Sequence, residues 1–339
     1  MVILFSEHFD ISTSEVMEWI DHLGGEPVRL NGSEIFEANT FAHSLSLDNA
    51  TGQKLQIRFW GKDIKAEDIT YVWFRRDEQG SMPPYIRAIK DKSLRKKVAQ
   101  HLSIEMLRAK DFLKIALLQK PHIGNPRERS FAKFLPLQIA QSLDIDIPAT
   151  LITERKKELQ DFKNKHRKVI TKAISDSDFF ELDDGTVISS YTNEIDQEIL
   201  DSAHEQFGVT LAQEMLEKEL EIRSFYLFGK FYSMAIFSQI DQKTAVDFRR
   251  YNIQKPNRNV PFKLSEELER KADQLMRTLG LNTGSLDFVK TTDGRYVFLE
   301  VNPVGQFGMT SKPCNYYLEK ILASYMTSQE PQRNQGYHE

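Results

Sequence analysis

The most constraining feature of this sequence is a hairpin pattern over residues 284–303. Two apolar runs, GSLDFVKT and RYVFLEVNP, flank an Asp-Gly pair, which is a strong turn signal between strands. Because side chains alternate faces along a strand, Glu300 and Asn302 should point the same way. Asp287 lies on the first strand of the same hairpin, so the sequence predicts three oxygen-bearing side chains at one edge of an otherwise apolar sheet.

This set of side chains suits a hard cation. Carboxylate and amide oxygens are ligands of Mg²⁺, with water and phosphate oxygens completing its octahedron. We therefore expect Asp287, Glu300 and Asn302 to hold Mg²⁺. Acid pairs on strands are also common, so the alternative is that these three residues lie on a solvated face of the sheet.

Two lysines lie in apolar surroundings earlier in the chain. Lys133 stands in the helix start SFAKFLPL, and Lys172 stands in the strand pattern KVITKAIS. A buried lysine is costly unless its ammonium group meets an anion, and phosphate oxygens serve that role in phosphoryl-transfer sites. We expect both lysines to contact phosphate; the alternative is that their long side chains reach out to the solvent.

The segment AQEMLEKELEIR carries groups suited to a nucleotide. Its expected strand end, Gln213, Glu214, Met215 and Leu216, offers backbone groups to an adenine edge, and two of its side chains can cover the ring. Glu221 can bond the ribose hydroxyl groups. We interpret the charged residues 217–219 as a solvated loop.

Arginines complete the predicted site. Arg223 follows Glu221 by two residues and can reach phosphate. AVDFRRYN offers Arg249 and Arg250, one of which can hold a carboxylate or an acyl phosphate through its forked guanidinium group. Because adjacent side chains diverge, we expect at most one of the two to point into the site. A second Arg-Arg pair, Arg75 and Arg76, occurs in WFRRDEQG. We favour a surface role for this pair over a catalytic one.

Length and composition limit the remaining choices. A chain of 339 residues exceeds one ordinary core, which favours two or three lobes. The net charge of −4 gives no reason to expect nucleic-acid binding. The single cysteine fits a reducing cytosol, and no apolar run approaches the roughly 20 residues needed to cross a bilayer. We therefore expect a cytoplasmic protein without a membrane partner. Walker, G-x-S-x-G and G-x-G-x-x-G motifs are absent from the sequence.

The order of secondary-structure signals predicts an α/β (α+β) protein. Short strands alternate with helices over residues 1–90, and residues 91–120 form one long amphipathic helix. A Ser-capped, Gly-terminated helix is expected over residues 265–280. Antiparallel pairs are expected around Gly229-Lys230 and around the Asp-Gly turns of DDGTVISSY and TTDGRY.

Lys133, Lys172, QEML, EIR, Asp287 and FLEVNP occur in this order with strands and helices between them. This series resembles the ATP-grasp ligase superfamily across nearly the whole chain. Within that superfamily, YVWFRRD and FLEVNPVGQFG are most similar to the peptide maturases that make graspetides, the microviridin-type ligases and the grasp-with-spasm group. The ribosomal-protein glutamate ligases share the second half and are more distant in the first.

The resemblance implies a three-lobed ATP-grasp fold, with ATP clamped between two β-sheet lobes. Its expected divisions are an N-terminal lobe with the long helix at 1–124, a central lobe at 125–212, a C-terminal lobe at 213–327 and a flexible tail at 328–339. By position, the implied cofactor-binding residues are Lys133, Lys172, Gln213, Glu214, Met215, Leu216 and Glu221, the Mg²⁺ ligands are Asp287, Glu300 and Asn302, and the catalytic residues are Arg223 and Arg249. One departure is the segment AISDSDFFELDDG, which stands where many members have a glycine-rich flap.

The resemblance also implies an activity. An ATP-dependent ligase would phosphorylate Asp or Glu side chains of a ribosomally made precursor peptide, leader plus core, and join them to Ser/Thr hydroxyl groups or Lys amines as macrocycles. An alternative is a ligase that adds glutamate or another amino acid to a protein tail. An alternative of another class is a nucleotide-binding scaffold without catalysis. A homodimer is the expected symmetric default.

Overall fold

The computed structural model describes residues 1–35, 37, 40–50, 52–76, 84–127, 133–174, 179–181, 184, 187–189, 192–238 and 257–328. The chain clusters into two compact units. The first comprises Met1–Arg129, Gly280–Thr283 and Phe307–Glu339, and the second comprises Ser130–Leu279 and Gly284–Gln306. The second unit therefore contains the sheets that we expected in the central and C-terminal lobes, and the three-lobe division remains a prediction.

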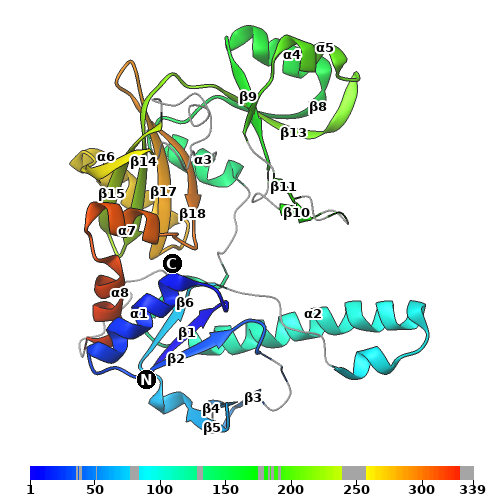
Figure 1. Cartoon of the computed structure of the whole chain (residues 1–339), viewed down its shortest axis with the longest axis vertical. Coiled ribbons are helices and arrows are strands. Elements are labelled where there is room, and N and C mark those ends of the chain that lie inside the picture. The colour runs from blue at the N-terminus through cyan, green and yellow to red at the C-terminus, as the bar shows by residue number, and fades with distance from the viewer. Residues whose placement is uncertain are drawn as a thin grey trace. The chain divides into compact units, whose positions relative to one another are not determined.

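A parallel sheet forms the centre of the first unit (Figure 1). Its strands follow the order β2 (Pro27–Asn31), β1 (Val2–Ser6), β6 (Tyr71–Phe74) and β7 (His122–Ile123). Every residue of β1 and β6 is buried, as expected for parallel strands that are covered on both faces. This burial explains why both strands are continuous apolar runs in the sequence.

Three helices accompany this sheet in the first unit. They are α1 (Ile11–His22), α7 (Gly308–Cys314) and α8 (Leu318–Thr327), and α1 packs against α8. Neither α7 nor α8 was predicted from the sequence. The N-cap of α8 is Tyr317 in the left-handed conformation, with φ of 54° and no side-chain capping bond, so the usual start signal is missing.

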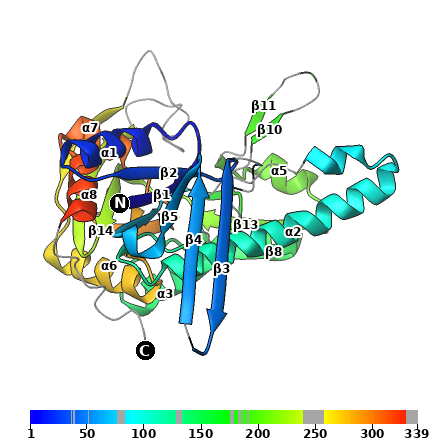
Figure 2. The ribbon, with the colours of Figure 1, turned by 90° about the horizontal axis from the view of Figure 1, so that it is seen from below.

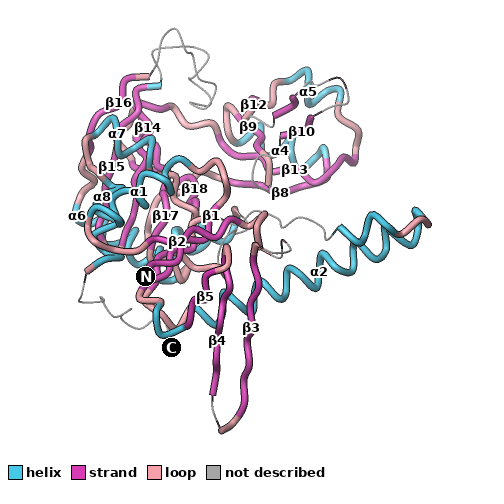
Figure 3. The backbone as a smooth tube through the Cα atoms, turned by 60° about the horizontal axis from the view of Figure 1, so that its bottom comes forward, coloured by secondary structure: helices cyan, strands magenta, loops and turns pink. Residues whose placement is uncertain are grey.

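A long hairpin and a long helix complete the first unit. The antiparallel sheet runs β3 (Phe41–Asp48), β4 (Gly52–Phe59), β5 (Lys62–Lys65), and short 3-10 turns lie at Ala66–Asp68 and Pro84–Ala88. Figures 2 and 3 show β3, β4 and helix α2 (Lys92–Leu117) extending away from the parallel sheet. The long helix is confirmed, but only its C-terminal third joins the core, through Leu113 and Leu117. Leu94, near its start, is 52% exposed.

The second unit contains an antiparallel sheet in the order β12 (Asn193–Glu194), β9 (Val169–Lys172), β13 (Gln206–Glu214), β8 (Thr150–Arg155). Helices α4 (Lys156–Lys165) and α5 (Gln197–Ser202) contribute Leu159 and Leu200 to a core on one face of this sheet. The expected pair β10 (Phe179–Glu181) and β11 (Val187–Ser189) is antiparallel. This core lies on one face of the sheet, so α4 and α5 do not cover the opposite face.

A larger sheet follows, in the order β16 (Arg258–Phe262), β15 (Lys230–Phe237), β14 (Lys218–Leu227), β17 (Thr283–Thr291), β18 (Tyr296–Asn302). Helix α6 (Glu266–Thr278) begins where expected, because the Ser265 hydroxyl accepts a hydrogen bond from the Leu268 amide at 3.2 Å. Tyr226 donates to Asp273 of α6 at 2.7 Å, which fixes this helix on one sheet face. Helix α3 (Phe134–Ser142) packs against β18.

The described residues include no helix that is both long and apolar enough to span a membrane.

Candidate active site

The two predicted lysines meet at the end of β9. Lys133 is the residue just before helix α3, and its ammonium group donates to the carbonyl oxygen of Ala173 at 2.9 Å. Lys172 is the last residue of β9 and directly precedes Ala173. Both side chains are half-buried. The structure therefore brings two ammonium-bearing residues, 39 positions apart in the sequence, to the same strand end.

Lys172 shares a sheet face with the predicted adenine-binding strand. In the register of β13 on β9, Leu211 lies opposite Lys172 and Gln213 lies opposite Ile170, so these alternate residues point to one face. That face is the one opposite the α4 and α5 core. Gln213 is 2% exposed and donates to the Thr150 hydroxyl at 2.9 Å.

Glu214, the last residue of β13, and Met215, which follows it, form hydrogen bonds to neighbouring segments. The Glu214 carboxylate accepts a hydrogen bond from the Ala149 amide at 3.0 Å and lies 3.5 Å from the His166 ring. The Met215 amide donates to the Lys168 carbonyl at 2.9 Å. Met215 and Leu216 are half-buried. Because the Met215 amide is already used, an adenine edge here would bond other backbone groups of this segment.

Glu221 lies in a compact polar group at the start of β14. One of its oxygens accepts from the Lys218 ammonium group at 2.9 Å and from the Ser238 hydroxyl at 2.8 Å. The Lys218 side chain is only 10% exposed. Our interpretation of Lys218 as part of a solvated loop is therefore wrong, because a buried carboxylate three residues away pairs with it. Glu219, by contrast, is exposed and pairs with Lys290.

The predicted metal-binding residues share one face of the β17–β18 pair. Asp287 lies directly opposite Glu300, and Ser285 lies opposite Asn302. The pairing is irregular between Asp287 and Phe288. The Asn302 side-chain oxygen also accepts from the Val304 amide at 3.0 Å, which shapes the turn after the strand. The cross-strand carboxylates and the amide oxygen fit an oxygen-coordinated divalent cation.

Arg223 lies on β14, next to this carboxylate pair. Its Nη1 is 3.5 Å from Asp287 Oδ2, and the two side chains are 8% and 15% exposed. Arg223 Nε is buried and has no hydrogen-bond partner among the described residues. A buried guanidinium group with unused donors is suited to bind a further anion.

Helix α3 links the lysine end of this region to the carboxylate end. Its first turn follows Lys133, which contacts the end of β9, and its body packs against β18, which carries Glu300. A backbone bond from Phe298 of β18 to Asp146 at 2.8 Å holds the segment that follows α3. Arg249 lies outside the described residues.

The described residues include no group of three or more His, Cys, Asp or Glu residues that could hold a metal; the set on β17 and β18 has two carboxylates and an amide.

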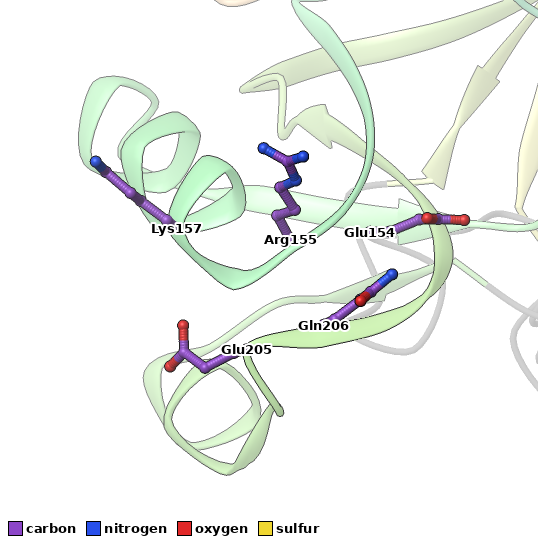
Figure 4. Close-up of a pocket in the computed structure, with 5 residues that line it drawn as sticks. All are labelled: Glu154, Arg155, Lys157, Glu205 and Gln206. Atoms are coloured by element: carbon purple, nitrogen blue, oxygen red, sulfur yellow. The ribbon is translucent and has the colours of Figure 1, made fainter.

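A pocket of about 360 Å³ lies elsewhere, lined by Glu154, Arg155, Lys157, Glu205 and Gln206. Its side chains point in different directions rather than converging (Figure 4), so this pocket offers no organised ligand site.

The structure also corrects our interpretation of the Arg75–Arg76 pair. The Arg75 side chain is 2% exposed, and its Nε lies 3.2 Å from the carboxylate of Asp10. Its guanidinium carbon lies 5.2 Å from the centre of the Phe307 ring. Burial lowers the pKa of Arg75 to about 10. The partner is 65 positions away, so no local pattern could have revealed this ion pair.

Comparisons with known proteins support the fold. No family model matches the sequence, and no curated protein matches it. Among solved structures, the chain is similar to a RiPP-associated ATP-grasp ligase of Chryseobacterium gregarium in complex with ADP and a leader and core peptide. The TM-score is 0.82, the sequence identity is 22%, and 97% of each chain is covered.

Two other solved structures agree. The macrocyclase MdnC of Microcystis aeruginosa, bound with the precursor peptide MdnA, has a TM-score of 0.78 at 24% identity, covering 97% of this chain and 99% of that one. The ATP-grasp ligase PsnB, complexed with a minimal precursor, Mg and ADP, has a TM-score of 0.72 at 16% identity, covering 96% of each chain. The expected ATP-grasp fold is therefore confirmed over nearly the full length.

Proposed function

We propose that this protein is an ATP-dependent ligase that forms macrocycles in a ribosomally made precursor peptide. The observation that carries the proposal is the cross-strand pair Asp287 and Glu300 beside the buried Arg223. This arrangement offers oxygen ligands for a divalent cation next to a cationic group for an anion. Solved structures of the same fold hold ADP and precursor peptides, which supports the same substrate class here.

The reaction has two steps. The γ-phosphate of ATP passes to a side-chain carboxylate of the peptide, giving an acyl phosphate and ADP. A Ser/Thr hydroxyl or a Lys amine of the same peptide then attacks the acyl carbon. Phosphate leaves, the attacking group loses its proton, and an ester or an amide remains. This chemistry needs no nucleophile from the protein, so the protein acts by positioning and by stabilising charge.

We assign these roles to the predicted site residues. Lys133 and Lys172 would bind phosphate oxygens, and Arg223 would bind the transferred phosphoryl group or the activated carboxyl group. Residues 213–216 would bind the adenine, and Glu221 would accept from the ribose. Asp287, Glu300 and Asn302 would hold Mg²⁺, which supplies charge neutralisation for the transferred phosphoryl group. Arg249 is proposed as a second arginine at the carboxyl group.

One mass spectrum tests the proposal. The full-length protein is incubated with ATP, Mg²⁺ and a leader-bearing peptide rich in Thr/Ser and Asp/Glu, taken from the reading frames beside its gene. We expect the peptide to lose one water mass for each bond formed, together with ADP release. Unchanged peptide mass during nucleotide turnover would overturn the proposal. A mass gain would instead identify a ligase that adds amino acids.

Glu300→Ala provides the matched control for this experiment. It should abolish both ADP formation and the loss of water mass in a ligase. A nucleotide-binding scaffold would show neither signal in the unsubstituted protein, and its partner binding would not respond to the substitution.

A further inference from the structure

A second polar centre lies in the first unit, at the carboxyl ends of its parallel strands. The order β2-β1-β6-β7 places the strands that follow β1 on opposite sides of it. The chain order thus reverses between β1 and β6. In open parallel sheets, ligands bind outside the carboxyl ends of the strands at such a reversal.

The residues at this point are charged. The amides of Arg75 and Arg76, just after β6, both donate to the carbonyl of Phe5 on β1, at 3.1 and 3.0 Å. Asp10, in the loop after β1, forms ion pairs with both guanidinium groups. The Nε atoms of Arg75 and Arg76 each lie 3.2 Å from its Oδ2. Glu7 is the second carboxylate, 2.7 Å from Arg76 Nη1.

The two arginines differ in how firmly they are held. Arg75 is buried and packs against the rings of Trp73 and Phe307, so its role is to support the site. The Arg76 side chain is 29% exposed, and its partner Glu7 is 36% exposed. A partly exposed ion pair contributes little net stability, so Arg76 can exchange Glu7 for another carboxylate at small cost.

The Nη1 end of Arg76 is the part that an incoming carboxylate can reach. The Nε of Arg76 is buried against Asp10 Oδ2, whereas Nη1 pairs with the partly exposed Glu7. Phe9, in the same loop as Glu7, is 95% exposed, and Ile11, the first residue of α1, is 70% exposed. An incoming peptide would thus find an exchangeable guanidinium group beside two exposed apolar side chains.

We propose that Arg76 binds a side-chain carboxylate of the acidic substrate peptide, displacing Glu7, with Phe9 and Ile11 contacting the flanking residues. This inference rests on the proposed function for the peptide's identity as a substrate. Arg76 is a positioning residue in this view. It holds the peptide by an acidic residue and takes no part in phosphoryl transfer.

Fluorescence anisotropy tests this site without nucleotide. The probe is a fluorescein-labelled synthetic peptide of alternating Thr and Glu with one Phe, and its control replaces every Glu with Gln. Arg76→Gln should weaken binding of the Glu peptide about tenfold or more, as expected for the loss of a charge-assisted contact. Glu7→Gln should tighten it severalfold, because the internal competitor is removed.

Arg58→Gln is the matched control. Arg58 also pairs with an acid, Asp63, on the first unit, but its side chain is 62% exposed and lies on the β4–β5 hairpin. It should leave binding unchanged. Any of three results would overturn the inference. They are equal binding by Arg76→Gln and Arg58→Gln, weaker binding by Glu7→Gln, and no binding of the Glu peptide to the unsubstituted protein. Thermal melting by circular dichroism shows that each variant is folded, and Arg76→Lys should recover part of the affinity.

The two proposals fail in different ways. If the ligase proposal alone is wrong, Arg76-dependent peptide binding persists while the mass spectrum shows no loss of water. If the Arg76 site alone is wrong, the loss of water persists in Arg76→Gln with an unchanged peptide KM.

Discussion

Asp287 and Glu300 lie directly opposite each other on β17 and β18, so their carboxylates share one face of the sheet. Directly opposed side chains in an antiparallel pair have Cβ atoms about 4.5–5.5 Å apart, and like charges at that spacing repel. Arg223 offsets the charge of Asp287 from β14. A divalent cation would offset the remaining charge, which is why we expect this face to be functional.

Glu300→Gln should separate function from stability. It removes one of the two opposed charges, so the free energy of unfolding in urea should stay the same or rise. ADP formation should fall by about a hundredfold or more, because charge stabilisation of the phosphoryl group is lost. Glu219→Gln is the control, since Glu219 is an exposed residue of the same sheet that pairs with Lys290. Normal turnover by Glu300→Gln would contradict the assignment.

Asp287→Asn, in contrast to Glu300→Gln, should lower the free energy of unfolding. It leaves the buried Arg223 guanidinium group without its carboxylate, and breaking such a pair costs about 3 kcal/mol of unfolding free energy. Adding Arg223→Met removes the uncompensated charge, so the double variant should be more stable than Asp287→Asn alone. Urea denaturation in EDTA measures both. A double variant less stable than the single one would show that the two side chains do not form a coupled pair.

Structural features whose signal is local in the sequence could be predicted. The Asp-Gly turn and the alternation along the second strand predicted that Glu300 and Asn302 share a face and that Asp287 lies at the same edge of the sheet. The register of β17 on β18 agrees, with Asp287 directly opposite Glu300. Helix α6 was equally accessible, because Ser265 caps it within the same segment. The irregular pairing after Asp287 was not predicted, since it depends on how two strands settle against each other.

Interactions between distant segments could not be predicted. The carboxylate that pairs with both Arg75 and Arg76 comes from Asp10, in the loop that follows β1, 65 positions earlier in the chain than Arg75. Lys218 looked like part of a charged run, and its burial depends on Ser238 and Glu221 meeting across two strands. In both cases the charged residue is buried because of tertiary packing, which a charge pattern in one segment does not record.

Lys133→Met should weaken ATP binding with little loss of stability. Its ammonium group donates to one carbonyl, that of Ala173, and it is proposed to bind phosphate. We expect the Kd for ATP to rise about tenfold or more, measured by isothermal titration calorimetry. The matched control is Lys156→Met, because Lys156 likewise donates to backbone carbonyls, those of Asp201 and Ala203 at 3.0 Å. Lys156→Met should lower stability and leave ATP affinity unchanged; equal Kd values for the two variants would refute the role of Lys133.

His122 should make the stability of the protein fall in mild acid. Burial lowers the pKa of His122 below its ordinary value, although a hydrogen bond to the Lys120 carbonyl opposes the shift. The unfolded chain therefore takes up a proton near pH 6.5 that the folded chain resists. The stability that depends on a neutral, buried His122 is therefore fully present above about pH 6.5. Below that pH the free energy of unfolding falls by up to about 1.4 kcal/mol per pH unit.

The variant His122→Phe keeps a ring against Phe74 and removes the titrating group. Between pH 6.5 and 5 its free energy of unfolding should decline less steeply than that of the unsubstituted protein. His204→Gln, at an exposed position, should leave the slope unchanged. Parallel curves for His122→Phe and the unsubstituted protein would rule out this cause.

Gly124 and Gly61 form a matched pair for testing how tightly β7 packs. Both have positive φ, +80° and +76°, so alanine at either position should cost about 1–2 kcal/mol in backbone strain. A Cβ on Gly61 would meet nothing within 4 Å, whereas one on Gly124 would lie 2.5 Å from the Phe74 carbonyl oxygen. The Gly124 amide also donates to Asn282 at 2.8 Å, so a shift of this backbone would disturb the segment 280–283 as well. Gly124→Ala should therefore lose about 2 kcal/mol more unfolding free energy than Gly61→Ala, measured by urea denaturation at neutral pH. Equal losses would mean that Phe74 and β7 can move apart freely, and that the close approach at Gly124 does not constrain the first unit.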